Sequence, residues 1–134
     1  MRRHGDLVGI VYLDVDDFKE INDNLGHDAG DRVLVTTADR LSTVVRPDDT
    51  VARLGGDEFV VVCPRLADAS ALDAAAARLV ERIGEPLMVG SEELHLAASA
   101  GVALFDPAVD DARSLLMHAD ETMYATKRER IAAL

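Results

Sequence analysis

The sequence predicts one α+β domain built on an antiparallel-rich sheet. Its 134 residues suit a single domain with a hydrophobic core of its own. Apolar segments of strand length alternate with segments whose apolar residues recur at helical spacing, in the order βααβ-βαβα. A glycine pair at residues 55–56 separates two of the strand-like segments, as in a hairpin. We therefore expect an antiparallel sheet with the helices packed on one side.

The first predicted strand covers residues 7–14. This segment is almost continuously apolar, as expected of a central strand buried on both faces, and it ends in Asp14. Apolar residues at helical spacing then predict a short helix over residues 18–25. Gly26 is expected to end that helix.

A longer helix and a hairpin follow. Gly30 and Asp31 are expected to open the helix, and Pro47 to halt it. Residues 50–53 and 58–63 are then predicted to be the two arms of a hairpin around the glycine pair. This hairpin becomes a candidate neighbour of the first strand.

The last third of the chain predicts two further helices and a strand. Ser70, with Asp73 three residues later, resembles a capping box that starts a helix, and Gly84 ends it. Residues 94–105 alternate between apolar and other residues, which predicts one long strand. A final helix is expected from about Asp111, with basic residues at its end, where they suit the helix dipole.

Composition narrows the classes of partner. With 14 basic and 25 acidic residues the net charge is −11, which argues against a nucleic acid polymer as partner. Cys63 is the only cysteine, so no disulfide forms within the chain. No apolar run approaches the roughly 20 residues that span a bilayer. We expect a cytoplasmic setting without direct membrane contact, either alone or as the cytosolic part of a larger protein.

The acidic residues at the hairpin suggest a metal site. Asp14 ends a buried strand, and Asp57 and Glu58 follow the glycine pair at the hairpin tip. Carboxylates held together are costly unless a cation lies between them, and all-oxygen ligands favour Mg²⁺ or Mn²⁺. Two such ions would promote nucleotidyl transfer. On the turn alone, Asp57 and Glu58 fit a plain exposed turn equally well, and Asp14 favours the metal site.

Five sequence blocks, in the right order, resemble the GGDEF family, the diguanylate cyclases. Residues 55–59 read Gly-Gly-Asp-Glu-Phe, and residues 13–23 are similar to the family's D-x-D-x-F-K-x-I-N-D segment. The other blocks are Gly26-His27 with Gly30-Asp31, residues 98–103, which are similar to S-x-G-x-A, and residues 119–127, which are similar to A-D-x-A-M-Y-x-A-K.

The resemblance implies a ferredoxin-like, palm-type fold of the nucleotide cyclase kind. It implies that two GTP molecules are condensed into cyclic di-GMP and two pyrophosphates, with two Mg²⁺ or Mn²⁺ ions in each half-site of a homodimer. Residues 1–134 are interpreted as a single GGDEF domain that lacks the family's usual N-terminal helix and any sensory domain. We expect low activity from this domain alone.

The resemblance also implies roles for individual residues. Asp14, Asp57 and the backbone carbonyl of Val15 would bind the metals. Asp57 would also assist loss of the 3′-hydroxyl proton, with Glu58 close by as the second catalytic acid.

Five further positions match the substrate-binding residues of the family. Asn22 and Asp31 would read the guanine edge. Phe18 and Lys19 match the turn around the phosphates, and Lys127 matches the lysine that meets the triphosphate. Plainer interpretations stay open: Asn22 as an exposed helix residue, Asp31 as a favourable charge near a helix start, Phe18 as a core residue, and Lys127 as a solvated helix-end cation.

Arg46 and Asp49 match the family's R-x-x-D site, at which the cyclic product binds and inhibits. Taken alone, this spacing is usual for a surface ion pair. A second function is a catalytically weak or inactive module that binds GTP or cyclic di-GMP as a sensor. Residues 127–131 replace the family's K-x-x-G-R segment, which favours that second function, whereas the intact residues 55–59 favour the enzyme. In a purely structural dimerisation domain, the predicted site residues would be replaceable without effect.

Overall fold

The computed structural model describes residues 7–132, apart from the side chains of residues 126 and 128–132. Within these residues lie a four-stranded sheet, a two-stranded sheet and four helices, so the predicted α+β class is confirmed. The elements in chain order are β1 (Leu7–Val15), α1 (Phe18–Leu25), α2 (His27–Val44), β2 (Thr50–Gly55), β3 (Glu58–Leu66), α3 (Ala69–Ile83), β4 (Leu87–Val89), β5 (Glu92–Leu94), β6 (Ala98–Leu104) and α4 (Ala112–Ala132).

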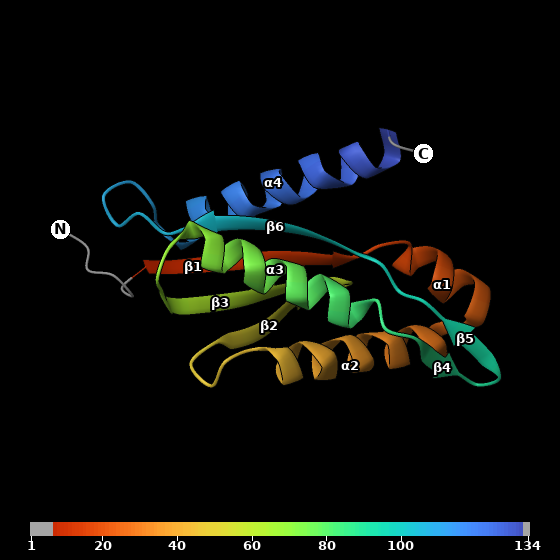
Figure 1. Cartoon of the computed structure of the whole chain (residues 1–134). Coiled ribbons are helices and arrows are strands. Elements are labelled where there is room, and N and C mark those ends of the chain that lie inside the picture. The colour runs from red at the N-terminus through yellow and green to blue at the C-terminus, as the bar shows by residue number, and fades with distance from the viewer. Residues whose placement is uncertain (1–6, 133–134) are drawn as a thin grey trace.

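β1 is an inner strand of the larger sheet, whose strand order is β2-β3-β1-β6 (Figure 1). All three pairs of neighbouring strands are antiparallel. Leu13 of β1 lies between Phe59 of β3 and Ala100 of β6. Because β1 has a neighbour on each side and packed residues on both faces, its sequence is apolar along almost its whole length.

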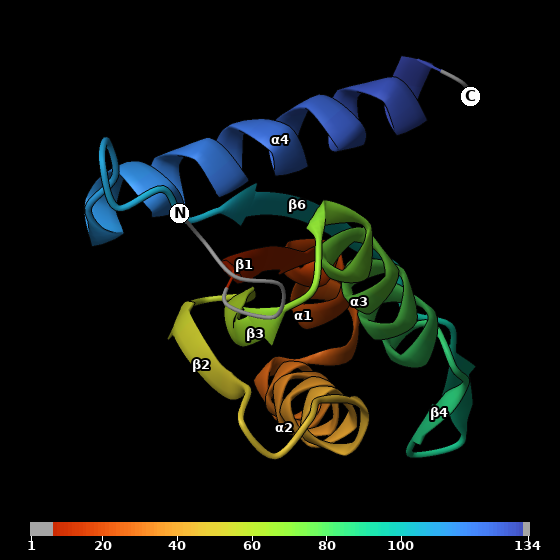
Figure 2. The ribbon, with the colours of Figure 1, turned by 60° about the vertical axis from the view of Figure 1, so that its left-hand side comes forward.

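Helices cover both faces of this sheet, so the expectation of helices on one side is wrong. On one face, Leu13 belongs to a core cluster that includes Leu79 of α3. On the other face, Ile10 packs in a second cluster with Ala119 and Met123 of α4. Figure 2 shows α4 on one side of the sheet, and α2 and α3 on the other. The apolar residues of β1 predict burial of both faces, but they do not say which helix covers which face.

Two helices begin at residues other than those predicted. α2 begins at His27 instead of Gly30. The reason is that Gly26, with a φ of 95°, already interrupts the helical conformation after α1, so that a new helix can start at the next residue. α3 is capped by Asp68 instead of Ser70. The Asp68 side chain accepts a hydrogen bond of 2.9 Å from a backbone N–H of the first turn.

The single strand predicted over residues 94–105 is interrupted. β5 ends at Leu94, and β6 begins only at Ala98. β4 and β5 form a hairpin of their own, with three residues in each strand. Strands this short show no readable alternation in the sequence, so the hairpin escapes a pattern-based prediction.

Gly101 of β6 allows α4 to lie directly on the sheet. A Cβ atom at Gly101 would come within 2.0 Å of the Ala119 carbonyl oxygen and 2.2 Å of the Met123 nitrogen. The Thr122 hydroxyl donates a hydrogen bond of 3.1 Å to the carbonyl of Val102 at the same place. This contact fixes the middle of α4 against β6. No helix of the described chain, α4 included, combines the length and the apolar character needed to cross a membrane.

The substitution Gly101→Ala is expected to lower the free energy of unfolding by about 1–3 kcal/mol, because the added methyl group overlaps the backbone of α4. Urea unfolding measures the effect. Gly84→Ala is the matched control, since a Cβ there finds its nearest atom at 3.4 Å and the change should stay within about 0.5 kcal/mol. Equal stability of the two variants would contradict the close approach of α4.

Candidate active site

Acidic residues from distant parts of the sequence meet at the end of β1. Asp14 pairs directly with Glu58 of β3. The Val15 N–H donates a hydrogen bond of 3.1 Å to the Asp57 carbonyl. Asp14 and Glu58 are therefore a non-hydrogen-bonded pair, in which Cα atoms lie about 4.5 Å apart and side chains approach most closely. The predicted neighbourhood of the first strand and the glycine turn is confirmed.

The glycine pair shapes the turn that carries two of these acids. Gly55 has a φ of 148° and Gly56 a φ of 51°, and both values favour glycine over residues with a side chain. Arg53 steadies the turn, because its Nε donates a hydrogen bond of 2.9 Å to the Gly56 carbonyl. The turn places Asp57 half-buried at the start of β3.

The ionisation of Asp57 reflects its crowded surroundings. Burial raises the pKa of the Asp57 carboxyl to about 6, and the neighbouring carboxylates of Asp14 and Glu58 act in the same direction. Among the described residues, Asp14 Oδ1 is buried and has no hydrogen-bond partner. A buried carboxylate oxygen without a partner is costly, so it is a ready ligand for a cation.

α4 supplies a positive charge to this site. Lys127 Nζ donates a hydrogen bond of 3.0 Å to Asp14 Oδ2 and lies 3.6 Å from Asp16 Oδ1. The hydrogen bond to Asp14 raises the pKa of Lys127. Asp16 also accepts a hydrogen bond of 2.8 Å from the hydroxyl of Ser99 in β6. Asp16 and Ser99 were not predicted as site residues from the sequence, although both lie within the blocks of family resemblance.

Glu58 is held by a residue that the sequence analysis missed. The Tyr12 hydroxyl donates a hydrogen bond of 2.6 Å to Glu58 Oε2. Burial, and next the bond to Glu58, raise the pKa of Tyr12, so this tyrosine stays a hydrogen-bond donor. Within the sequence, Tyr12 is one more large residue of an apolar run. Its position two residues before Asp14, and hence on the same face of β1, is the only signal.

The donor set fits a hard divalent cation. Asp14 and Asp57 offer carboxylate oxygens, and Val15, which follows Asp14, has a main-chain carbonyl. No three Asp, Glu, His or Cys side chains of the described residues could hold a metal ion together. The two carboxylates of Asp14 and Asp57 suit Mg²⁺, which commonly takes one or two carboxylates and completes its shell with water and substrate phosphate.

The two residues predicted to read guanine lie on neighbouring helices. Asn22 Nδ2 is 3.1 Å from His27 Nδ1, and a Cβ at Gly30 would come within 2.3 Å of Asn22 Oδ1. The Asn22 amide thus lies against Gly30, the residue before Asp31 in the sequence. Asp31 itself is exposed and lines a hollow of about 310 Å³ whose walls come from α2 alone. Asn22 does not line this hollow.

Phe18 and Lys19 begin α1 immediately after the acidic site. Phe18 is partly buried against the first core cluster, so its interpretation as a core residue is supported. Its ring lies 3.4 Å from the position of a Cβ at Gly30. Lys19 is exposed.

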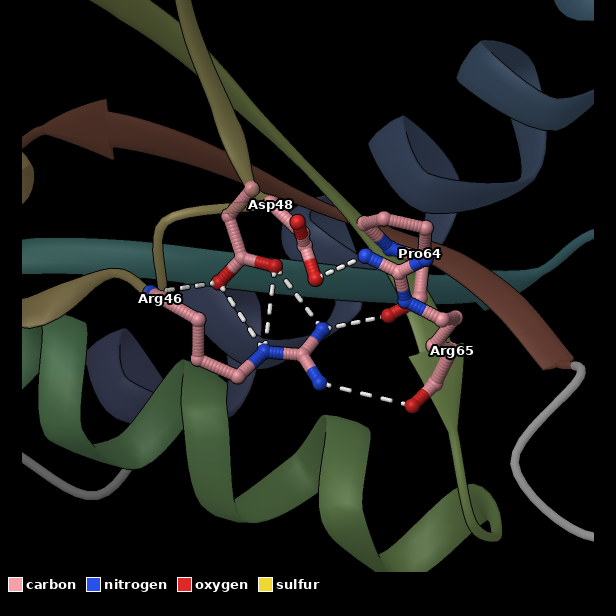
Figure 3. A network of polar contacts seen from close by, with 5 residues as sticks. Arg46, Asp48, Pro64 and Arg65 are labelled. Atoms are coloured by element: carbon pink, nitrogen blue, oxygen red, sulfur yellow. Dashed lines mark hydrogen bonds and ion pairs between the residues drawn. The ribbon is translucent and has the colours of Figure 1, made fainter.

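Arg46 and Asp49 form a tight pair at the far end of the sheet. The Arg46 guanidinium donates hydrogen bonds of 2.8–3.4 Å to the Asp49 carboxylate, and the Arg46 backbone N–H donates one of 2.9 Å. Figure 3 shows the same guanidinium pointing to the backbone carbonyls of Pro64 and Arg65 at the end of β3. An ion pair between Arg65 and Asp48 lies alongside. The bond to Asp49 raises the pKa of Arg46 further.

A separate apolar hollow of about 570 Å³ lies between α3 and β6. Ala98 and Ala100, which line it, belong to the face of the sheet that carries α3. Asp14 and Lys127 meet on the opposite face, beside α4. The hollow is therefore not part of the acidic site.

Comparisons with known proteins identify the family of this chain. Residues 1–131 match the family model described as diguanylate cyclase, GGDEF domain. The chain is 38% identical to the diguanylate cyclase TpbB of Pseudomonas aeruginosa, over 94% of this chain and 29% of TpbB. It is also 38% identical to the cyclic di-GMP phosphodiesterase PdeR of Escherichia coli, over 90% of this chain and 18% of PdeR. The chain thus spans less than a third of either relative.

A solved structure shows the same fold. The crystal structure of the GGDEF domain of DgcB from Caulobacter crescentus, in complex with c-di-GMP, superimposes with a TM-score of 0.85 at 30% sequence identity. The match covers 93% of this chain and 74% of that chain. The ferredoxin-like, nucleotide cyclase-like fold expected from the sequence is confirmed.

The raised pKa of Asp57 predicts a pH dependence of stability without divalent cations. The folded state holds a proton on Asp57 up to about pH 6, whereas the unfolded chain releases it near pH 3.8. The free energy of unfolding should therefore fall as pH rises between these values. Asp57→Asn should remove this fall, and at pH 7 it should be more stable than the wild type by at most about 1 kcal/mol, because solvent screens a half-exposed group.

Urea unfolding in a chelator, at several pH values, measures this difference. Asp73→Asn, which changes an exposed carboxylate of α3, is the matched control and should follow the wild-type curve. If the free energies of unfolding of the wild type and Asp57→Asn changed with pH in the same way, the pKa of Asp57 would not be raised in the folded protein.

Proposed function

This chain belongs to the GGDEF domain family, and on that premise we propose that it is a diguanylate cyclase domain that condenses two GTP molecules into cyclic di-GMP. The observation that carries the proposal is the convergence of Asp14, Asp57 and Glu58 at the end of β1, with Lys127 of α4 above them. This arrangement joins a cation site to a basic side chain, as a nucleoside triphosphate requires.

Asp14, Asp57 and the Val15 carbonyl would hold Mg²⁺ or Mn²⁺, two ions in each half-site. Bound there, the ions would neutralise charge on the α-phosphate and make the 3′-hydroxyl a better nucleophile. The buried, unpaired Oδ1 of Asp14 supports its role as a ligand. Asp57 could accept the proton of the 3′-hydroxyl near neutral pH, with Glu58 beside it.

In each of the two transfers, the 3′-oxygen of one GTP forms a bond to the α-phosphorus of the other. The bond between that phosphorus and the oxygen that bridges to the β-phosphate breaks, and its electron pair leaves with pyrophosphate. The proton of the hydroxyl passes to the base and then to water. Two such steps close the ring of cyclic di-GMP and release two pyrophosphates.

Lys127 would pass from a carboxylate to a phosphate when substrate binds. Its ammonium group has three N–H donors, and one of them now bonds Asp14. A triphosphate that enters beside Asp14 would offer the same donors a larger negative charge. The lysine also offsets the acidic background, which otherwise repels the nucleotide.

Asn22 and Asp31 would bind the guanine edge, and Phe18 and Lys19 would form the turn around the phosphates. The position of the Asn22 amide against Gly30, the residue before Asp31, supports the first assignment. The start of α1 directly after the acidic site supports the second.

A homodimer is needed for the complete reaction. Each domain would hold one GTP, and two domains must face each other so that each 3′-hydroxyl meets the α-phosphate of the other GTP. The rate then depends on the effective concentration of one domain beside the other. We propose further that residues 1–134 act as a single catalytic domain in the cytoplasm, where the buried thiol of Cys63 stays reduced.

Arg46 and Asp49 would form the inhibitory site for the cyclic product. They are already paired, and Arg46 also bonds the carbonyls at the end of β3. A bound product would have to replace part of these bonds, and Arg46 would contribute its planar fork. The c-di-GMP bound to the related GGDEF domain of DgcB supports a product site in the family.

A second candidate function is a regulatory module that binds GTP or cyclic di-GMP without turnover. The similarity to PdeR, a phosphodiesterase by name, favours this alternative. The intact acidic site favours the enzyme.

Incubation with GTP and Mg²⁺ tests the proposal. The wild type is expected to produce cyclic di-GMP, at a rate per domain that rises with protein concentration, whereas Asp57→Ala should produce none. Product chromatography at several protein concentrations measures both. Asp73→Ala on α3 should behave as the wild type. Binding of GTP without any product would favour the regulatory module, and a rate per domain that is independent of concentration would contradict the homodimer.

Arg46→Ala is expected to weaken cyclic di-GMP binding and to lower the free energy of unfolding by about 1–3 kcal/mol, because Asp49 and the β3 carbonyls lose the guanidinium donors of Arg46. Arg65→Ala is the matched control. It removes only an exposed ion pair with Asp48 and should change stability by less than about 1 kcal/mol. Calorimetric titration with cyclic di-GMP, below the unfolding temperature of each variant, separates binding from folding. Unchanged affinity in Arg46→Ala would exclude this site for the product.

A further inference from the structure

Tyr12 lies beside the acidic site but has no part in the reaction described so far. Its side chain is only 8% exposed and packs in the core cluster under α4. Its hydroxyl nevertheless points to a charged group, because it donates a 2.6 Å hydrogen bond to Glu58. A short bond from a buried hydroxyl to a carboxylate is of the strong, charge-assisted kind.

The register of β1 and β3 explains how the two groups meet. Tyr12 pairs with Val60, and Asp14 pairs with Glu58. Tyr12 is thus the diagonal neighbour of Glu58 on the face that carries α4. The Glu58 carboxylate has Asp14 directly opposite and the Tyr12 hydroxyl on its buried side.

Without this hydroxyl, repulsion from Asp14 would favour conformations in which the Glu58 side chain points away from the site. Like charges placed directly opposite on neighbouring strands repel each other, as Asp14 and Glu58 do here. A glutamate is long and flexible, and it can turn toward water. The Tyr12 hydroxyl fixes one carboxylate oxygen of Glu58 and so restrains this side chain beside Asp14.

We propose that Tyr12 is a positioning residue, whose hydroxyl holds the Glu58 carboxylate beside Asp14, so that Glu58 joins Asp14 and Asp57 around a divalent cation when one binds. The inference rests on the proposed function and deepens it. Tyr12 touches neither the cation nor the nucleotide, and it acts only through Glu58. Residues that orient metal-site carboxylates in this way change metal affinity when they are removed.

Tyr12→Phe tests this role, because it removes the hydroxyl and keeps the ring that packs under α4. Mn²⁺ binding is measured by electron paramagnetic resonance, in the presence of a non-hydrolysable GTP analogue. The affinity for Mn²⁺ should fall about tenfold, at the lower end of the range for residues that orient metal ligands. Tyr124→Phe, at a residue that is 60% exposed, is the matched control and should bind as the wild type does.

A double substitution shows whether Tyr12 acts through Glu58. In a Glu58→Gln background, the change Tyr12→Phe should have little further effect on Mn²⁺ affinity, because the carboxylate that it positions is gone. Equal losses from Tyr12→Phe in both backgrounds would show that it acts through general packing instead. That outcome would overturn the inference.

Tyrosine fluorescence gives a readout that needs no substitution at Tyr12. The chain has no tryptophan and two tyrosines, so the emission of Tyr124→Phe comes from Tyr12 alone. Addition of Mg²⁺ with the GTP analogue should change this emission, since the acceptor of the Tyr12 hydroxyl then faces a cation. Emission that stays unchanged while the analogue binds would contradict the proposed link.

The outcomes separate the two proposals. If the wild type binds Mn²⁺ and Tyr12→Phe binds it equally well, the positioning role is overturned and the diguanylate cyclase proposal stands. If the wild type binds no Mn²⁺ with the analogue present, the proposed function fails, and the positioning role fails with it.

Discussion

The structure depends on one electrostatic constraint at the end of β1. Asp14, Asp57 and Glu58 are brought together by strand pairing and by a glycine turn, and their mutual repulsion has to be offset by positive charge. Among the described residues, the Lys127 ammonium group supplies positive charge. It bonds one carboxylate oxygen of Asp14 and leaves the other oxygen without a hydrogen-bond partner. A divalent ion would satisfy what the lysine leaves open.

The packing of α4 links this site to the rest of the fold. The helix can approach β6 only because Gly101 has no side chain, and one turn beyond that contact it presents Lys127 to Asp14. The same helix buries Tyr12, whose hydroxyl holds Glu58. One face of the sheet thus provides both the apolar packing and the polar contacts of the site, so displacement of α4 would disturb the two together.

The sequence predicts the fold class. It also predicts that the end of β1 and the glycine turn are neighbours, because the signals for both elements are local and strong. The apolar run of β1, the glycine pair and the apolar stripe of α3 each depend on a few adjacent residues. The face covered by α4 could not be predicted, since β1 is apolar on both faces. The β4–β5 hairpin was too short to show a pattern. Tyr12 was hidden within an apolar run, because only the register with β3 shows that its hydroxyl meets Glu58.

Crystals grown with Mn²⁺ and a non-hydrolysable GTP analogue would test the central claim most directly, through the anomalous signal of the metal. The account predicts a Mn²⁺ peak about 2.1 Å from carboxylate oxygens of both Asp14 and Asp57, with Lys127 moved from Asp14 to a phosphate. A Mn²⁺ peak elsewhere, with the bond between Lys127 and Asp14 intact, would contradict it.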